Sequence, residues 1–204
     1  DFDYCINTYK TDVACCGNKV CDADENLCNC PADCGVCERE YGKYIEFECS
    51  DSLECKSKLK DADLVSKQTF DFELKEDRFL LMVSPSLDQP FTIGSDKVDM
   101  TMTMRSKDED LKHLTILEIK MMDSEQLLGQ TSGLSTKISE MDVPYQFELP
   151  IDYEMIADKP EENRDPEMIV LYRYTYGSGD SEKTKTDDES FDFDDIYFID
   201  PELN

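Results

Sequence analysis

Hydrophobic and polar residues alternate in short runs over most of the chain after Gln68. In the run Lys97–Arg105, for example, Val98, Met100, Met102 and Met104 alternate with polar residues. A period of two is typical of a strand with one buried face. The other runs with strand character are Thr69–Leu74, Arg78–Val83, Tyr145–Ile151, Met168–Tyr176 and Phe191–Ile199. Polar stretches separate these runs, so the pattern predicts a mainly β fold, an antiparallel immunoglobulin-like β-sandwich.

One segment, residues 108–128, carries two conflicting patterns. Its large apolar residues lie near helical spacing: Leu111, Leu114, Leu117, Met121 and Leu128. Thr115, Ile116 and Ile119 are β-branched, which favours a strand. We predict a strand at about 113–121, and a helix that crosses between the two sheets is the alternative.

The composition changes near Lys56. All ten cysteines lie within the first 55 residues, and this segment has little periodic apolar pattern. A segment so short and so poor in Leu, Ile and Val has too small a core to fold by burial alone, so cross-links must stabilise it. The chain is therefore predicted to have two domains, a disulfide-rich module at 1–55 and a sandwich at 56–204.

The cysteine count indicates a disulfide framework formed in an oxidising compartment. Ten cysteines allow five bridges, but the sequence leaves their pairing open. The start at Asp1 rather than Met suggests a processed secreted protein or the excised outer part of a longer protein with an anchor or signal. No apolar run of about 18 residues predicts a membrane span. We expect an extracellular, cell-surface location. The cysteines are Cys5, Cys15, Cys16, Cys21, Cys28, Cys30, Cys34, Cys37, Cys49 and Cys55.

The charge balance excludes one class of partner. The chain has 48 acidic and 21 basic residues, a formal net charge of −27. So negative a protein repels nucleic acid phosphates and anionic lipid surfaces. No nucleic-acid partner is expected.

The acidic residues among the cysteines suggest an ion site. Asp22, Asp24 and Asn26 occupy relative positions 1, 3 and 5 of a loop, and Asp33 occupies position 12, which is the ligand spacing of a calcium loop. Position 6 is Leu27 rather than Gly, so we expect a loop held by disulfides rather than an EF-hand. The predicted ion is Ca²⁺, with a candidate ligand set of Asp22, Asp24, Asn26, Cys28 and Asp33. The alternative is a module that only cross-links the chain, with these acids as surface residues; zinc and iron–sulfur sites fit the crowded cysteines poorly.

These residues also resemble a known module. A CG-x-G-x-C core, an acidic stretch with Glu-Asn and a C-P-x-D-C end recur in secreted and cell-surface proteins of archaea and bacteria, and the module is distantly similar to the calcium-dependent Lin12-Notch repeat. Lys19 replaces the second Gly here, and one residue separates Cys28 from Cys30. The resemblance implies an extracellular, archaeal setting and no enzymatic activity. The matching residues are Cys16-Gly17, Cys21-Asp22, Glu25-Asn26, Cys28 and Cys30-Pro31-Ala32-Asp33-Cys34.

The chain offers little for catalysis. His113 is the single histidine, and no nucleophile motif or phosphate-binding glycine loop accompanies it. Tyr172, Tyr174 and Tyr176 share one face of a predicted strand, as core, interface or ligand-stacking residues. Met100, Met102, Met104 and Met155 could bind copper(I), but a row of Met on one strand face is typical of a core. We predict that the protein is not an enzyme.

The function expected from these features is structural or adhesive. We predict a self-assembling subunit of a prokaryotic surface filament, sheath or layer, joined to copies of itself by strand addition or head-to-tail docking. The candidate donor strands are Asp1–Val13 and Phe191–Asn204. The alternative is a monomeric module that binds a glycan or a cell-surface protein through loops at 157–167 and 177–190.

Overall fold

The computed structural model describes residues 16–37, 39–60, 65–155 and 159–200. The chain forms two compact units, each described here by itself. The predicted boundary after Cys55 falls inside a strand, Cys55–Leu59. We call the two parts the disulfide unit, Asp1–Ala62 with Ala157–Glu161 and Asp200–Asn204, and the sandwich unit, Asp63–Ile156 with Glu162–Ile199.

The disulfide unit contains little regular structure. One short helix, α1 (Pro31–Cys34), begins with a proline in its first turn, where the missing N–H leaves no bond unmade. Three antiparallel strands follow in the order β1-β2-β3: β1 (Arg39–Tyr41), β2 (Ile45–Cys49) and β3 (Cys55–Leu59). No described helix is long and apolar enough to cross a membrane.

The sandwich unit is built from two large sheets and one small one. The first large sheet has the order β10-β9-β13-β14, and the second has the order β11-β8-β6-β4, with β5 also paired to β6. The small sheet has the order β12-β15-β7. The strands are β4 (Ser66–Thr69), β5 (Phe72–Glu76), β6 (Phe79–Gln89), β7 (Phe91–Thr92), β8 (Lys97–Lys107), β9 (Leu111–Asp123), β10 (Gln126–Ile138), β11 (Pro144–Pro150), β12 (Glu161–Arg164), β13 (Glu167–Tyr176), β14 (Lys183–Asp192) and β15 (Ile196–Ile199).

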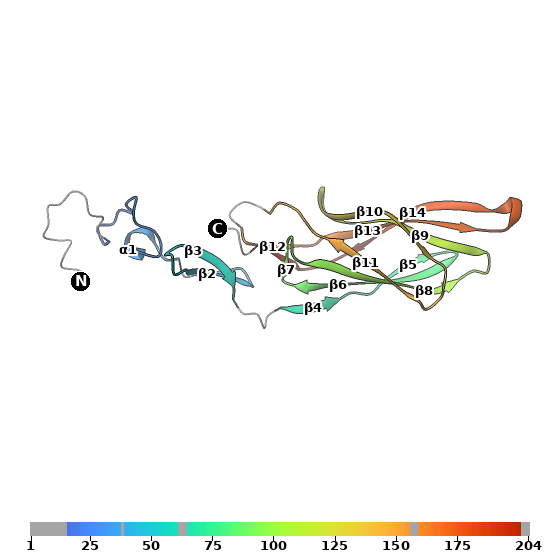
Figure 1. The fold of residues 1–204 in the computed structure, drawn as a ribbon, viewed down its shortest axis with the longest axis horizontal. Coiled ribbons are helices and arrows are strands. Elements are labelled where there is room, and N and C mark those ends of the chain that lie inside the picture. The colour runs from blue at the N-terminus through green and yellow to red at the C-terminus, as the bar shows by residue number, and fades with distance from the viewer. Residues whose placement is uncertain (1–15, 38, 61–64, 156–158, 201–204) are drawn as a thin grey trace. The chain divides into compact units, whose positions relative to one another are not determined.

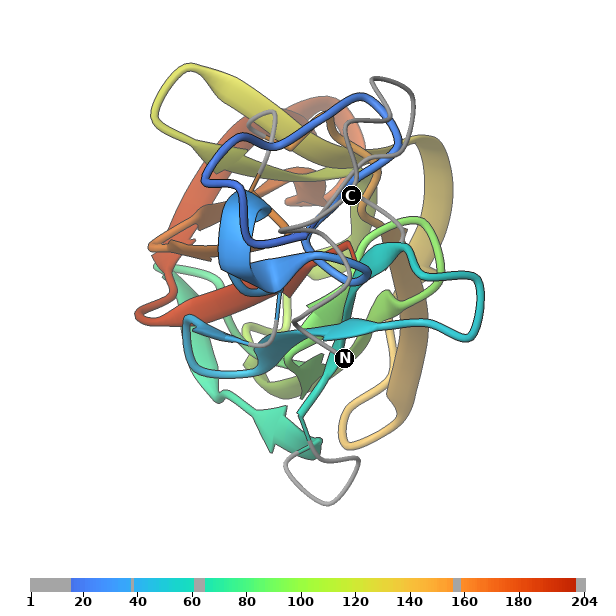
Figure 2. The ribbon, with the colours of Figure 1, turned by 90° about the vertical axis from the view of Figure 1, so that its left-hand side faces the viewer.

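The two large sheets lie face to face (Figure 1). Their facing side chains form one hydrophobic core. Burial alternates along all eleven residues of β6, as a strand with one core face requires. Met100, Met102 and Met104 on β8 are almost fully buried, so this row belongs to the core. The view along the layers shows β4 to β6 (green) in one sheet and the β9–β10 hairpin (yellow) in the other (Figure 2). The predicted mainly β architecture with a disulfide-rich segment before it is confirmed.

The order of the first large sheet matches one half of an immunoglobulin domain. Consecutive strands β9 and β10 pair, β13 and β14 pair, and β9 pairs with β13, which is the C′-C-F-G arrangement of variable domains. In the second sheet, β6 has the next long strand, β8, as its neighbour. In the immunoglobulin order A-B-E-D, strand B has strand E as its neighbour, and strand E comes after strand C in the chain. Here the neighbour of β6 is β8, which comes before β9, so the second sheet differs from that order.

The strand predicted at about 113–121 is present as β9 (Leu111–Asp123), and the helical alternative is wrong. β9 pairs with β10 and with β13, so hydrogen bonds fix its backbone on both sides. Its partner β10 was not predicted. The register of β10 shifts twice, once between Leu127 and Gly129 and once between Ser132 and Thr136, and these bulges break the period of two.

Two stretches predicted as binding loops contain strands. Residues 183–192 form β14 and residues 161–164 form β12, so the loop interpretation of 157–167 and 177–190 is wrong over these parts. Nine of the ten side chains of β14 are exposed or half-buried. A strand without a buried face carries no hydrophobic alternation, which explains the error.

The C-terminal candidate for a donor strand also needs correction. Phe191, Phe193, Ile196, Phe198 and Ile199 are buried in the chain's own fold. Residues 191–199 therefore cannot add to a second copy while this fold is intact. The N-terminal candidate, Asp1–Val13, lies outside the described residues.

Candidate functional site

Four disulfides organise the disulfide unit. Cys16–Cys30 and Cys21–Cys34 close the acidic loop on itself. Cys28–Cys49 and Cys37–Cys55 join the loop to β2 and β3. Cys49 and Cys55 face each other in the register of these strands, so two bridges reach adjacent positions of one hairpin. The predicted disulfides are confirmed for eight cysteines; Cys5 and Cys15 lie outside the described residues.

Asp33 closes the acidic loop through its carboxylate. The backbone N–H groups of Gly17 and Asn18 donate to Oδ2, and that of Lys19 donates to Oδ1 at 2.7 Å. Gly17 and Lys19 both have positive φ, which helps to turn successive N–H groups toward one point. Asp33 thus acts as an internal anion that orders residues 17–19.

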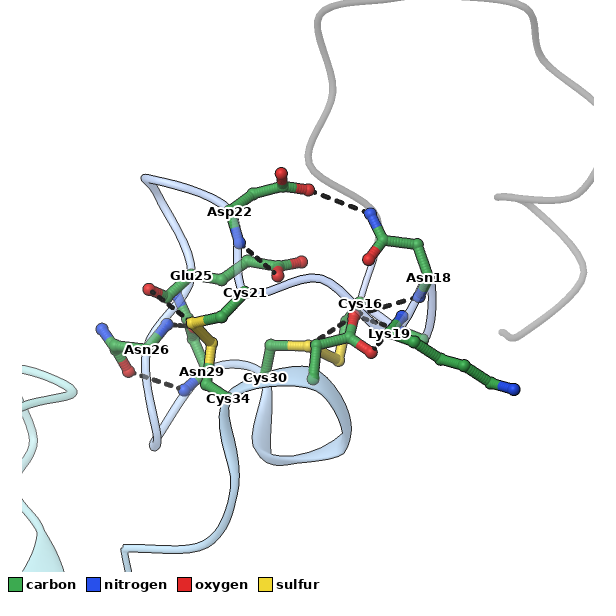
Figure 3. Close-up of a disulfide and its surroundings, with 12 residues drawn as sticks. Cys16, Asn18, Lys19, Cys21, Asp22, Glu25, Asn26, Asn29, Cys30 and Cys34 are labelled. Carbon is green, nitrogen blue, oxygen red and sulfur yellow. Dashed lines mark hydrogen bonds between the residues drawn. A yellow bond between two sulfur atoms is a disulfide. The ribbon is translucent and has the colours of Figure 1, made fainter.

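Two other predicted ion ligands, Asp22 and Asn26, also make side-chain contacts within the loop (Figure 3). Asp22 accepts a hydrogen bond from the Asn18 side chain at 2.9 Å. Asn26 Oδ1 accepts from the N–H groups of Cys28 and Asn29, which is an Asx turn. The backbone oxygen of Asp24 accepts from Asn29 Nδ2.

One carboxylate beside this set was not predicted. Glu25 Oε2 accepts from the Asp22 N–H at 3.1 Å, while Glu25 Oε1 is buried with no hydrogen-bond partner among the described residues. The sequence signal for Glu25 was its place three residues after Asp22, where a side chain can reach back to a backbone N–H.

The structure does not gather the predicted ligands into one cluster. Among the described residues, two groups of His, Cys, Asp or Glu bring three ligand atoms within 4.8 Å of one another. One is Cys28, Cys37 and Cys49, and the other is Cys16, Cys30 and Asp33, so both consist mainly of disulfide sulfurs. Asp22 and Asp24 belong to neither group. Calcium binding stays a prediction.

The role of Asp33 can be tested by Asp33→Asn. We expect the variant to lose about 1–3 kcal/mol of local stability, because a charged acceptor of three N–H groups is replaced by a neutral one. Hydrogen exchange of the amides of residues 17–19 should become faster. Asp24→Asn is the matched control. It makes the same chemical change at a residue that contacts Asn29 through its backbone oxygen rather than through its carboxylate. Equal exchange in both variants would contradict the assignment.

A second carboxylate anchors the disulfide unit from a distant part of the chain. Glu161 is 8% exposed and accepts from the N–H groups of Lys43, Tyr44 and Ile45 at 2.6, 2.7 and 3.1 Å. Gly42 has a φ of 63°, and a Cβ there would overlap the Glu161 carboxylate. The close approach therefore requires glycine at 42. Nothing in the sequence pattern predicted this contact.

The tyrosine row of β13 belongs to the core over most of its length. Tyr172 and Tyr174 are 1% and 4% exposed, and their hydroxyls donate to Glu76 at 2.7 and 3.4 Å. Burial, and then the Glu76 carboxylate, raise the pKa of Tyr172 well above its usual value. Lys185 Nζ approaches Glu76 at 3.2 Å and Asp187 at 2.6 Å. This arrangement fits a core that meets an ion pair at its rim rather than a stacking site for a ligand.

Arg164 lies at the centre of another polar cluster. Its guanidinium pairs with Asp123 at 2.8 Å and with Glu162 at 2.6 Å, and it stacks on the Tyr153 ring at 4.7 Å. The Arg164 and Glu162 side chains are 12% and 5% exposed. Two carboxylates paired with one largely buried guanidinium form a structural network.

His113 lies half-buried on β9, opposite Thr175 of β13. Burial, followed by the nearby cations of Lys137, Arg173 and Lys112, lowers the pKa of His113 below its usual value. The predicted lack of enzymatic activity stays a prediction.

One sheet edge stands out by its geometry. β13 and β14 are paired at ten consecutive positions, from Glu167↔Asp192 to Tyr176↔Lys183, without a bulge. β14 is the last strand of its sheet, and no described strand pairs with its other side. It therefore presents a straight edge ten residues long.

The remaining edges of the large sheets are shorter or covered. β4 and β5 have four and five residues and are separated at Phe70 and Asp71. β10 and the segment of β11 lie against each other. The Asp152 N–H donates to the backbone oxygen of Leu128, and the Thr131 hydroxyl donates to the backbone oxygen of Glu148. Short strands, bulges and covering contacts are the usual protection of sheet edges. β14 has only its charged side chains for protection.

No protein-family model matches this chain, and no curated protein matches it.

Proposed function

We propose that this protein is an extracellular structural or adhesive subunit that assembles with copies of itself into a surface filament, sheath or layer. The observation that carries the proposal is the ten-residue edge of β14, which has no strand partner among the described residues. Backbone groups on such an edge can pair with another chain. A regular open edge is unfavourable in a protein that stays alone, so its presence favours assembly.

The disulfides support an extracellular setting. Bridges form and persist in oxidising compartments, and they stabilise units whose core is too small. Among the described residues of the disulfide unit, the buried hydrophobic ones are Cys30, Cys37, Tyr44 and Ile45. A unit held by covalent bonds rather than by a core suits a surface exposed to heat and proteases. The archaeal setting rests on the resemblance of the acidic loop alone.

Calcium is proposed as an ion for the acidic loop, at Asp22, Asp24, Asn26, Cys28 and Asp33. Two findings bear on this set: the carboxylate of Asp33 accepts three N–H groups, and the sulfur of Cys28 is bonded to Cys49. The proposal is tested by the heat of Ca²⁺ titration into the non-reduced protein and into Asp22→Asn. Equal heats, at the level of buffer dilution, would remove calcium from the account.

The proposed assembly is tested by electron microscopy of the purified, non-reduced chain at increasing concentration, with Ca²⁺ and with a chelator. We expect ordered particles that extend in one or two dimensions. A field of single small particles under every condition would contradict assembly. That result would favour the alternative, a monomeric module that binds a glycan or a cell-surface protein.

A further inference from the structure

The open edge of β14 offers backbone groups at regular intervals. In an antiparallel sheet, the N–H and C=O groups of alternate residues point to one neighbour and those of the remaining residues to the other side. Because β14 pairs with β13 at ten positions, about half of its backbone groups point away from β13. A second strand could pair with them without any change in the fold.

The charges on β14 are sorted along its length. Lys183 and Lys185 lie in its first half, and Asp187 and Glu189 lie in its second half. All four have odd numbers, so they share one face of the strand, the face that carries buried Phe191. The strand is therefore cationic at one end and anionic at the other.

This order selects an antiparallel copy of the same strand. Antiparallel pairing reverses one copy, so it places the cationic half of each strand opposite the anionic half of the other. Parallel pairing in register would place lysine beside lysine and carboxylate beside carboxylate. Opposite charges across a strand pair are stabilising, and like charges are destabilising.

One antiparallel register places opposite charges across from each other at all four charged positions on this face. When Lys183 faces Glu189 and Lys185 faces Asp187, Thr184 faces Asp188 and Thr186 faces Thr186 of the other copy. A shift of two residues in one direction places Asp187 opposite Asp187, and a shift in the other direction places Lys185 opposite Lys185. A shift of one residue leaves a single kind of ion pair and joins opposite faces of the two sheets.

We propose that two copies of this chain pair through β14 as antiparallel strands, with a two-fold axis at Thr186. Two four-stranded sheets, each β10-β9-β13-β14, then become one continuous sheet of eight strands. The contact rests on the proposed assembly and specifies one of its interfaces. An isologous contact closes on itself, so it forms a dimer, and a filament or layer requires a second, different contact.

The proposed contact requires the charged side chains of β14 to change partners. Lys185 now pairs with Asp187 in the same strand and with Glu76 of β5, and the Lys185 and Asp187 side chains are 46% and 40% exposed. Exposed ion pairs contribute little to stability, so the side chains can exchange partners at small cost. The same exposure makes the contact sensitive to salt, because screening at high ionic strength weakens pairs at a surface.

A charge exchange tests the contact directly. One variant carries Lys183→Glu and Lys185→Glu, and the other carries Asp187→Lys and Glu189→Lys. A dimer of either variant alone places like charges opposite each other at four positions. Its dissociation constant should therefore rise at least about 30-fold. A one-to-one mixture restores opposite charges at every position and should form mixed dimers, which sedimentation with one labelled variant detects.

Two controls separate the interface from general charge effects. Lys67→Glu with Lys97→Glu makes the same charge change at exposed ion pairs of the other large sheet and should leave dimerisation unchanged. Thr186→Cys should form an intermolecular disulfide across the two-fold axis, because its partner position is Thr186 itself. Thr184→Cys, which faces Asp188 in this register, should not.

The outcomes distinguish this interface from assembly in general. Cross-linking at position 186 and recovery in the mixture would establish the β14 contact. If the native chain assembles and both charge variants assemble equally well, the β14 contact is wrong while self-assembly stands. If the native chain stays monomeric and Thr186→Cys does not cross-link, both proposals fail.

Discussion

Phe193→Ala is expected to lower the free energy of unfolding of the sandwich unit by about 3–5 kcal/mol. Phe193 is 1% exposed, and its ring lies edge-on to Phe70 at 4.8 Å and to Phe72 at 5.3 Å between centroids. Removing this ring leaves a cavity beside Phe70 and Phe72. The loss combines the transfer free energy of the ring and the cavity that remains.

Urea unfolding followed by circular dichroism measures this loss, since the chain contains no Trp for fluorescence. Leu127→Ala is the matched control, because Leu127 is a large apolar residue that is 44% exposed. It should change stability by no more than about 0.5 kcal/mol. Similar losses in both variants would mean that residues 191–199 are not part of the chain's own core.

Removal of the Cys16–Cys30 bridge by Cys16→Ala with Cys30→Ala is expected to destabilise the disulfide unit by about 2–5 kcal/mol. The bridge closes the same loop that Asp33 orders. Cys30 is 1% exposed, so its replacement by Ala removes a buried side chain as well as the covalent bond. Limited proteolysis under non-reducing conditions should cut the variant between residues 16 and 60 and leave the native protein intact.

The sandwich unit serves as the internal control for this experiment. It contains no cysteine, so its resistance to protease should be the same in the variant and the native chain. Cleavage of the native chain at the same rate as the variant would show that the bridge does not stabilise the loop.

The strands that the sequence predicted are those with one buried face. β6 and β8 have burial that alternates with sequence, because each lies between solvent and the core, so periodicity alone reveals them. β9 was harder, because Leu114, Thr115 and Ile116 are all buried in succession. Its β-branched residues favoured a strand, and this prediction was correct.

The strands that were missed have no such signal. β14 exposes nearly all of its side chains, and β10 contains two bulges. Their hydrogen bonds come from the backbone, which every residue carries alike, so the side-chain pattern does not record them. The edge strand β14, through which we propose assembly, was for the same reason assigned as a loop.

The sequence predicted that the cysteines form disulfides, but not which cysteines pair. Asp33 was predicted as an ion ligand, and its hydrogen bonds from backbone N–H groups were not predicted, because they depend on how residues far apart in the sequence meet. Glu161, 118 residues from Lys43, shows the same limit. Single-residue patterns carry little information about contacts between distant segments.

The self-association of the native chain is the direct test of the proposed assembly. Light scattering on the non-reduced protein over a range of concentrations gives the molar mass, which is 23.5 kDa for one chain. The account predicts a mass of at least twice this value that falls as salt is raised. A mass of one chain at every concentration and salt would contradict it.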